Sequence, residues 1–123
     1  MLILLNGCVT CSKGGRIIGL SITHLEEGAG MFSLCNEEEA YEAFSVSGLS
    51  IKIPATDKVN TNTSSFTIPA ILTHRICNTI FSETKPKDKY EKVKLHIKYI
   101  CGDRKSTKIV PLPSIDVKDH KAF

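Results

Sequence analysis

Hydrophobic and polar residues alternate strictly along residues 90–100, and this alternation predicts a β-strand. In an extended strand, successive side chains point to opposite faces. One face would carry the apolar residues Val93, Leu95, Ile97 and Tyr99. The other face would carry Lys92, Lys94, His96 and Lys98. The segment is therefore expected to have one side in the core and a row of positive charge on the other.

A tight turn is expected at Gly14-Gly15, because glycine adopts the positive φ values of a two-residue hairpin turn. The flanking segments are apolar and rich in Ile, Leu and Val, so both are predicted to be strands that pair with each other. In the register set by this turn, Cys11 lies opposite Ile18 and Val9 opposite Leu20. The first thirty residues are thus predicted to form a β-hairpin.

Two helices are expected further along the chain. Asn36 can cap a helix N-terminus, and the glutamates at 37–39 favour its positive dipole end, so a short helix would begin there and end before Gly48. A second helix is predicted for residues 67–80, where apolar residues recur every four positions. The β-branched residues in this segment weaken its helix propensity.

The remaining segments are predicted to be strands, turns and loops. Residues 49–53 alternate as a strand, and the polar residues 55–65 have the composition of a flexible loop. A turn at Gly102-Asp103 leads to a strand over residues 107–112, which its prolines confine to a sheet edge. The tail, residues 116–123, is expected to be loosely held.

This order of elements predicts an α+β fold: a small antiparallel sheet of about four to six strands, with two helices packed on one face. At 123 residues, the chain is long enough to bury its own hydrophobic core, so residues 1–123 are expected to form a single compact domain. One face of the sheet would stay open to solvent or to a partner.

Charge is distributed unevenly along the chain, although the formal net charge is only +3. Residues 1–81 carry five Lys and Arg against seven Asp and Glu, whereas residues 82–123 carry eleven against six. The basic third is the part that could attract nucleic acid or an acidic membrane. Because most of its cations are lysines, the expected attraction is diffuse and not specific for base sequence.

The five cysteines form an odd set at irregular spacing, and several lie in apolar segments, where a reduced thiol behaves as a small hydrophobic side chain. This pattern favours a reducing, intracellular setting, such as the cytoplasm or nucleus of a host cell. No apolar run approaches the roughly 20 residues that span a bilayer. The apolar run at 1–5 is shorter than a secretory signal requires and is read as a first strand.

One set of residues could hold zinc: Cys8, Cys11, His24 and Cys35. This alternative would make the protein a zinc-stabilised module for protein–protein interaction. A CxxC pair with a distant histidine is a weak signal, and residues three apart on a strand point to opposite faces. Cys8 and Cys11 could therefore both ligate zinc only if the segment formed a knuckle. Otherwise no metal or other cofactor is expected.

No catalytic motif is present: the sequence has no nucleophile elbow, Gly-rich phosphate loop or paired catalytic carboxylates. A non-catalytic protein that acts by its surface is therefore predicted, and no small-molecule substrate is indicated. Its partner would be a polyanion, either RNA, DNA or an acidic membrane, and it could also bind itself or another protein through a sheet edge. Matrix-type and other small structural or accessory proteins of RNA viruses often have an α+β build, which is an analogy of fold alone.

The predicted polyanion site combines the cationic strand face with the basic residues before and after it. A plainer interpretation is that these lysines only keep a sheet soluble and guard its edge. The predicted residues are Lys85, Lys87, Lys89, Lys92, Lys94, His96, Lys98, Arg104, Lys105 and Lys108.

Overall fold

The computed structural model describes residues 2–26, 33–35, 40–53, 64–73, 75, 77 and 89–116. Within these ranges the chain forms strands and no helix, and so no helix there is long and apolar enough to cross a bilayer. The strands are β1 (Leu2–Val9), β2 (Gly15–Leu25), β3 (Ala40–Ile53), β4 (Ser64–Ile71), β5 (Lys89–Tyr90), β6 (Lys94–Cys101), β7 (Arg104–Pro111) and β8 (Ile115–Asp116).

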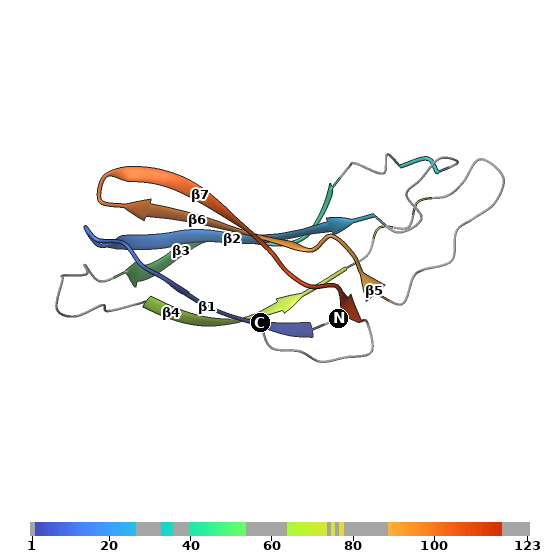
Figure 1. The fold of residues 1–123 in the computed structure, drawn as a ribbon, viewed down its shortest axis with the longest axis horizontal. Helices are drawn as coiled ribbons and strands as arrows, with labels where there is room; N and C mark the ends of the chain where they lie inside the picture. Colours follow the sequence, from blue (N-terminus) through green and yellow to red (C-terminus); the bar gives the residue numbers. More distant parts are fainter. Residues whose placement is uncertain are drawn as a thin grey trace.

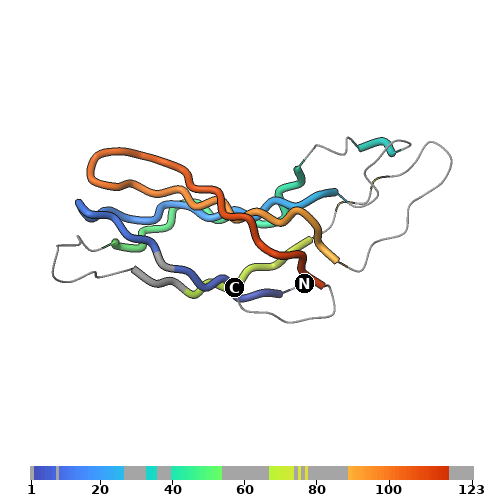
Figure 2. The backbone as a smooth tube through the Cα atoms, viewed as in Figure 1, coloured from blue at the N-terminus to red at the C-terminus, as the bar shows by residue number. Residues whose placement is uncertain are grey.

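The strands form three antiparallel sheets. The largest has the order β3-β2-β6-β7, while β1 pairs with β4 and β5 pairs with β8. The four-stranded sheet lies over the β1–β4 pair, so that the two sheets form the layers of a sandwich (Figure 1). The path of the chain crosses from one layer to the other between β1 and β2 (Figure 2). The described part of the protein is therefore all-β.

The hydrophobic core lies between the two layers. Alternate residues of the central strands point inward, with one shift at the bulge between Ile17 and Gly19 of β2, and most of these inward residues are almost fully buried. The core includes Ile3 and Leu5 of β1, Ile17, Leu20 and Ile22 of β2, Ile53 of β3, Leu72 after β4, Leu95 and Ile97 of β6, and Ile115 of β8. The alternation of burial predicted for residues 90–100 is confirmed from residue 92 to residue 98: Val93, Leu95 and Ile97 are buried, whereas Lys92, Lys94 and Lys98 are exposed. The single strand predicted there is wrong, because Tyr90 belongs to β5 in another sheet, Lys92 has a φ of 51° and β6 begins only at Lys94.

The predicted α+β fold is wrong where the structure describes it, because both expected helices coincide with strands. Residues 40–47 belong to β3, although the capping residues 36–39 lie outside the described residues. Residues 67–71 belong to β4. The apolar repeat of four positions misled the prediction, since residues four apart share a face in a strand as well as in a helix. Ile68 of β4 and Leu72, which directly follows β4, do both pack into the core.

The predicted hairpin between the first two strands is also wrong. Gly14 has a φ of 74°, and its N–H donates to the carbonyl oxygen of Cys11 at 3.0 Å, so the chain does turn there. However, β1 pairs with β4, whereas β2 pairs with β3 and β6. Each strand has an apolar face, and packing these faces against each other in two layers buries more apolar surface than placing them side by side in one sheet.

Other expectations are confirmed. Residues 49–53 are extended within β3, a turn lies at Gly102-Asp103, and β7 with its Pro111 forms one edge of the four-stranded sheet. The loop predicted at 55–65 lies outside the described residues except for its last two positions, which begin β4. The tail predicted at 116–123 also lies outside them, apart from residue 116 in β8. That the chain forms a single domain stays a prediction.

The outer face of the β1–β4 pair exposes several apolar side chains. Leu2 of β1 lies opposite Ile71 of β4, and Leu4 lies opposite Pro69, so these four side chains share one face. All four are exposed, and Ile71 has 63% of its surface accessible. This apolar surface is separate from the core and faces away from the four-stranded sheet.

Candidate functional site

The outer face of the four-stranded sheet gathers positive charge from all four strands. Partners in an antiparallel ladder point to the same face. One row of such partners crosses the sheet, from β7 to β3: Lys105, Ile100, Arg16 and Lys52. Along β6, the same face carries Lys98 and Lys94. The five side chains Arg16, Lys52, Lys94, Lys98 and Lys105 are hereafter called the cationic face.

The side chains of the cationic face are exposed, and none of them has an ion-pair partner among the residues that the structure describes. The stem of Lys98 lies over Gly19, whose missing side chain leaves room for it: a Cβ there would lie 3.6 Å from the Cβ of Lys98. Lys98 and Lys105 line a shallow hollow of about 380 Å³ whose other walls are serines, glycines and apolar residues of β2 and β3. The hollow is thus open to a ligand and positively charged.

His96 lies on the same face but is tied to a neighbouring strand. Its Nε2 lies 2.9 Å from Oγ1 of Thr23 in β2, and the ring is partly buried. Thr23 is also paired with Glu42 of β3, the strand on the other flank of β2. Glu42 therefore places an acidic side chain at the same end of the sheet as His96. The positive charge is therefore concentrated toward the opposite end, around Arg16, Lys52 and Lys105.

The structure separates the other predicted residues from the cationic face. Arg104 lies opposite Cys101, and Lys108 lies opposite Ile97, which places both on the inner side of the sheet at its β7 edge. Lys89 belongs to β5 in a different sheet, and Lys92 precedes β6 with a φ of 51°. Lys85 and Lys87 lie outside the described residues.

The sequence-based prediction missed Arg16 and Lys52. Arg16 stands between Gly15 and Ile17, and Lys52 between Ile51 and Ile53, at positions that alternation marks as outward. What makes them part of the site is the register, which pairs Arg16 with Lys52 on one side and with Ile100 on the other. Register between strands so distant in sequence has no local signal.

The predicted zinc ligands are not brought together. Cys11 forms a disulfide with Cys101, and Cys35 forms one with Cys77. These disulfides lie near opposite ends of β2, whose 11 residues span about 35 Å. Of the remaining predicted ligands, Cys8 lies in β1, and nothing is described of its side chain.

His24, the fourth predicted zinc ligand, has both ring nitrogens occupied. It is buried, with Nδ1 2.7 Å from the carbonyl oxygen of Leu25 and Nε2 2.8 Å from that of Thr73. The rings of Tyr41 and Tyr90 pack edge-on against it. His24 therefore joins β2 to the segment after β4 and has no nitrogen left to bind a metal ion.

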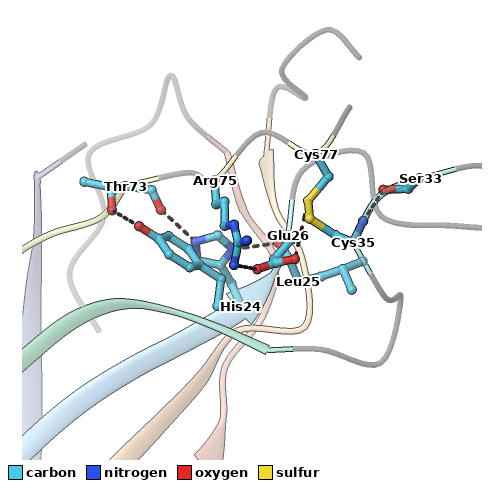
Figure 3. A network of polar contacts seen from close by, with 9 residues as sticks. His24, Leu25, Glu26, Ser33, Cys35, Thr73, Arg75 and Cys77 are labelled. Carbon is cyan, nitrogen blue, oxygen red and sulfur yellow. Dashed lines mark hydrogen bonds and ion pairs between the residues drawn. A yellow bond between two sulfur atoms is a disulfide. The ribbon is translucent and has the colours of Figure 1, made fainter. Parts of the chain in front are cut away.

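A second polar site lies where β2 ends, and we call it the Glu26 cluster (Figure 3). The carboxylate of Glu26 is 1% exposed, and Nη1 of Arg75 donates to its Oε1 at 3.0 Å. Its Oε2 lies 3.3 Å from Sγ of Cys77, which is bonded to Cys35. The cluster thus consists of a buried carboxylate between one guanidinium and one disulfide.

These contacts describe two candidate sites, an exposed cationic face and a buried carboxylate next to a disulfide. Comparison of the chain with models of known protein families, with curated proteins and with solved structures found no match.

Proposed function

We propose that the protein binds a polyanion through the cationic face. The observation that carries this proposal is the transverse row that places Lys105, Arg16 and Lys52 on one exposed surface, with no ion-pair partner for them among the described residues. Adjacent strands lie about 4.8 Å apart, so Arg16 and Lys52 are close neighbours and Lys105 is about 10 Å from Arg16. These separations are comparable to the Debye length of about 8 Å at physiological ionic strength, so the charges attract a ligand together.

The composition of the cationic face favours contacts to phosphate or another anionic group over recognition of bases. Four of its five cations are lysines, which act as point charges, and only Arg16 offers a bidentate fork. Tyr99 of β6 pairs with Ser106 and Ile17 and faces the inner side, so it offers no stacking surface to a base. Binding should therefore be insensitive to sequence and sensitive to salt.

RNA, DNA and an acidic membrane all present such anionic groups, and binding assays are needed to choose among them. The analogy with matrix-type viral proteins rested on an α+β build, and it loses its basis with that build. A non-catalytic role stays part of the proposal, since it derives from the absence of catalytic motifs in the sequence.

The cellular location also stays a prediction. The reducing compartment was inferred from cysteines taken as free thiols, and four of the five lie in disulfides. Disulfides persist mainly in oxidising compartments. This observation favours an oxidising setting over the cytoplasm or nucleus, and labelling of free thiols in protein from its native source would decide between them.

Reversing two charges on the cationic face is expected to weaken polyanion binding at least tenfold. The double variant Lys98→Glu with Lys105→Glu keeps Arg16 and Lys52 but makes their neighbourhood acidic. If four phosphates are contacted, a plot of the logarithm of the association constant for single-stranded RNA against the logarithm of the salt concentration should have a slope of about −3. In the variant, this slope should be about half as steep. Fluorescence anisotropy over a salt series measures both quantities.

The matched control is Arg104→Glu with Lys108→Glu, which changes the net charge equally on the other side of the sheet. This variant should keep binding within about twofold of the wild type. Equal weakening by the two double variants would assign the attraction to net charge, and would contradict the proposal. Running the same series with duplex DNA and with phosphatidylserine vesicles identifies the class of polyanion.

Self-association through a sheet edge is a further part of the proposed function. In the part of the chain that is described, β3 and β7 are the edges of the four-stranded sheet, and Ile109 of β7 is 54% exposed. Lysine on an edge strand opposes edge-to-edge pairing. The variant Ile109→Lys is therefore expected to lower any dimer fraction seen by sedimentation velocity, and a dimer fraction unchanged by it would exclude the β7 edge.

A further inference from the structure

The Glu26 cluster holds a buried carboxylate oxygen that has no hydrogen-bond donor in the described part of the chain. Oε1 of Glu26 accepts from Arg75, but Oε2 faces Sγ of Cys77 at 3.3 Å. A disulfide sulfur carries no hydrogen, so this contact cannot be a hydrogen bond. Buried polar groups are normally paired, and leaving one unpaired costs about 1–3 kcal/mol or more for a charged group. The oxygen is therefore a buried ligand atom whose remaining capacity a metal ion could use.

We propose that the cluster has a second state, which is a zinc site: when the Cys35–Cys77 disulfide is reduced, the two thiolates and the Glu26 carboxylate bind a divalent zinc ion. The ligand atoms of these three buried residues already lie within 4.8 Å of one another. In the described residues, no other group of three His, Cys, Asp or Glu side chains converges in this way. This site is independent of the polyanion binding proposed above.

The geometry of the cluster suits tetrahedral zinc. Bonds of about 2.3 Å to sulfur and 2.1 Å to oxygen place a sulfur and an oxygen ligand about 3.6 Å apart. The observed separation of 3.3 Å between Oε2 of Glu26 and Sγ of Cys77 is within a few tenths of an ångström of this value. The main change required is that the two sulfurs, now bonded to each other, move apart. Water would fill the fourth position, on the side of Cys35, which is 8% exposed against 2% for Cys77.

The charges of the cluster also balance. Two thiolates and one carboxylate carry three negative charges, and the zinc ion with the guanidinium of Arg75 carries three positive charges. The disulfide state is neutral as well, because Arg75 pairs with Glu26 at 3.0 Å. The buried cluster can therefore pass between the two states without gaining net charge, which burial would penalise. Arg75 can stay on Oε1 while Oε2 takes the metal.

The transition requires a thiol reductant, and its chemistry is thiol–disulfide exchange. A dithiol attacks the Cys35 sulfur, breaks the bond to Cys77 and forms a mixed disulfide. Its second thiol then displaces Cys35, so that the dithiol becomes a disulfide and two electrons and two protons pass to the two cysteines. Zinc binding displaces the two thiol protons. The site would thus report the reducing power of its surroundings through metal occupancy.

Zinc titration of the full chain in its two redox states tests this proposal. Protein reduced with a phosphine and then freed of it is expected to take one zinc ion in competition with a chromophoric chelator, at least 100-fold tighter than the oxidised protein. Cobalt in place of zinc should give the intense d–d and sulfur-to-metal charge-transfer bands of tetrahedral thiolate ligation. Oxidation should release the metal.

Two variants separate this site from adventitious binding to thiols. Glu26→Gln is expected to weaken zinc binding at least tenfold, whereas Cys11→Ser with Cys101→Ser removes the other disulfide and should leave zinc binding within about twofold. Circular dichroism checks that each variant is folded, and Cys77→Ser replaces Glu26→Gln if that variant is not. The proposal fails if the reduced wild type binds no zinc, if binding survives loss of the ligand, or if the Cys11 and Cys101 variant loses it.

Discussion

Replacing Cys11 and Cys101 together with alanine is expected to lower the free energy of unfolding by about 2–5 kcal/mol. Their disulfide joins residues 90 apart in sequence, so it removes much of the freedom of the unfolded chain. It also ties the turn before β2 to the end of β6, where the N–H of Gly102 donates to the carbonyl oxygen of Gly14 at 2.8 Å. Urea unfolding followed by circular dichroism, with oxidised protein, measures the change.

The second disulfide provides the comparison for this experiment. Cys35 and Cys77 are 42 residues apart, and the chain-entropy estimate for their loop is smaller by roughly 0.7 kcal/mol. Under a reductant, the wild type should lose the stability that both disulfides contribute and approach a variant that lacks all four cysteines. If the Cys11 and Cys101 variant unfolded at the same urea concentration as the oxidised wild type, that disulfide would have no role in stability.

Gly15→Ala is expected to destabilise the protein by about 3 kcal/mol or more, the upper range for overpacking. A Cβ at residue 15 would overlap the carbonyl oxygen of Ile100 in β6. This oxygen belongs to the backbone of a central strand, so the clash can be relieved only by moving the β2–β6 ladder. Gly15 is also paired with Ile53 of β3, and both of its neighbours would be disturbed. Thermal and urea unfolding give the change in stability.

Gly48→Ala is the matched control, because it adds the same methyl group elsewhere in the same sheet. A Cβ at residue 48 would meet no atom within 4 Å, and only its φ of +76° opposes the substitution. An alanine in this conformation costs roughly 1–2 kcal/mol. Gly15→Ala should therefore destabilise more than Gly48→Ala. The reverse order would mean that the close approach of β2 to β6 is not a constraint on the fold.

The candidate site could be predicted from the sequence only where the pattern was local. Lys94 and Lys98 alternate with Leu95 and Ile97 within one strand, and so their common outward face followed from the sequence alone. Lys108 shows the limit, because proximity along the chain suggested the same face, whereas the register with Ile97 places it on the other. Extending a patch beyond one strand requires the pairing of strands, which no local pattern encodes.

The fold, like the candidate site, could be predicted from the sequence only where the pattern was local. Apolar residues spaced four apart near Ile68 are compatible with both a helix and a strand, and β4 became extended because it pairs with β1 and packs on the core. The glycines Gly14 and Gly15 predicted that the chain turns there. They did not predict that this turn connects strands of two different layers.

The sequence by itself determined which segments alternate, where the chain turns at residue 102 and which face of β6 is charged. These properties depend on neighbours within a few residues. Only the tertiary structure decided the disulfide partners, the pairing of Arg16 with Lys52 and the burial of Glu26 beside Cys77. Each of these joins distant parts of the chain, and it is the burial of apolar surface between two layers that brings them together.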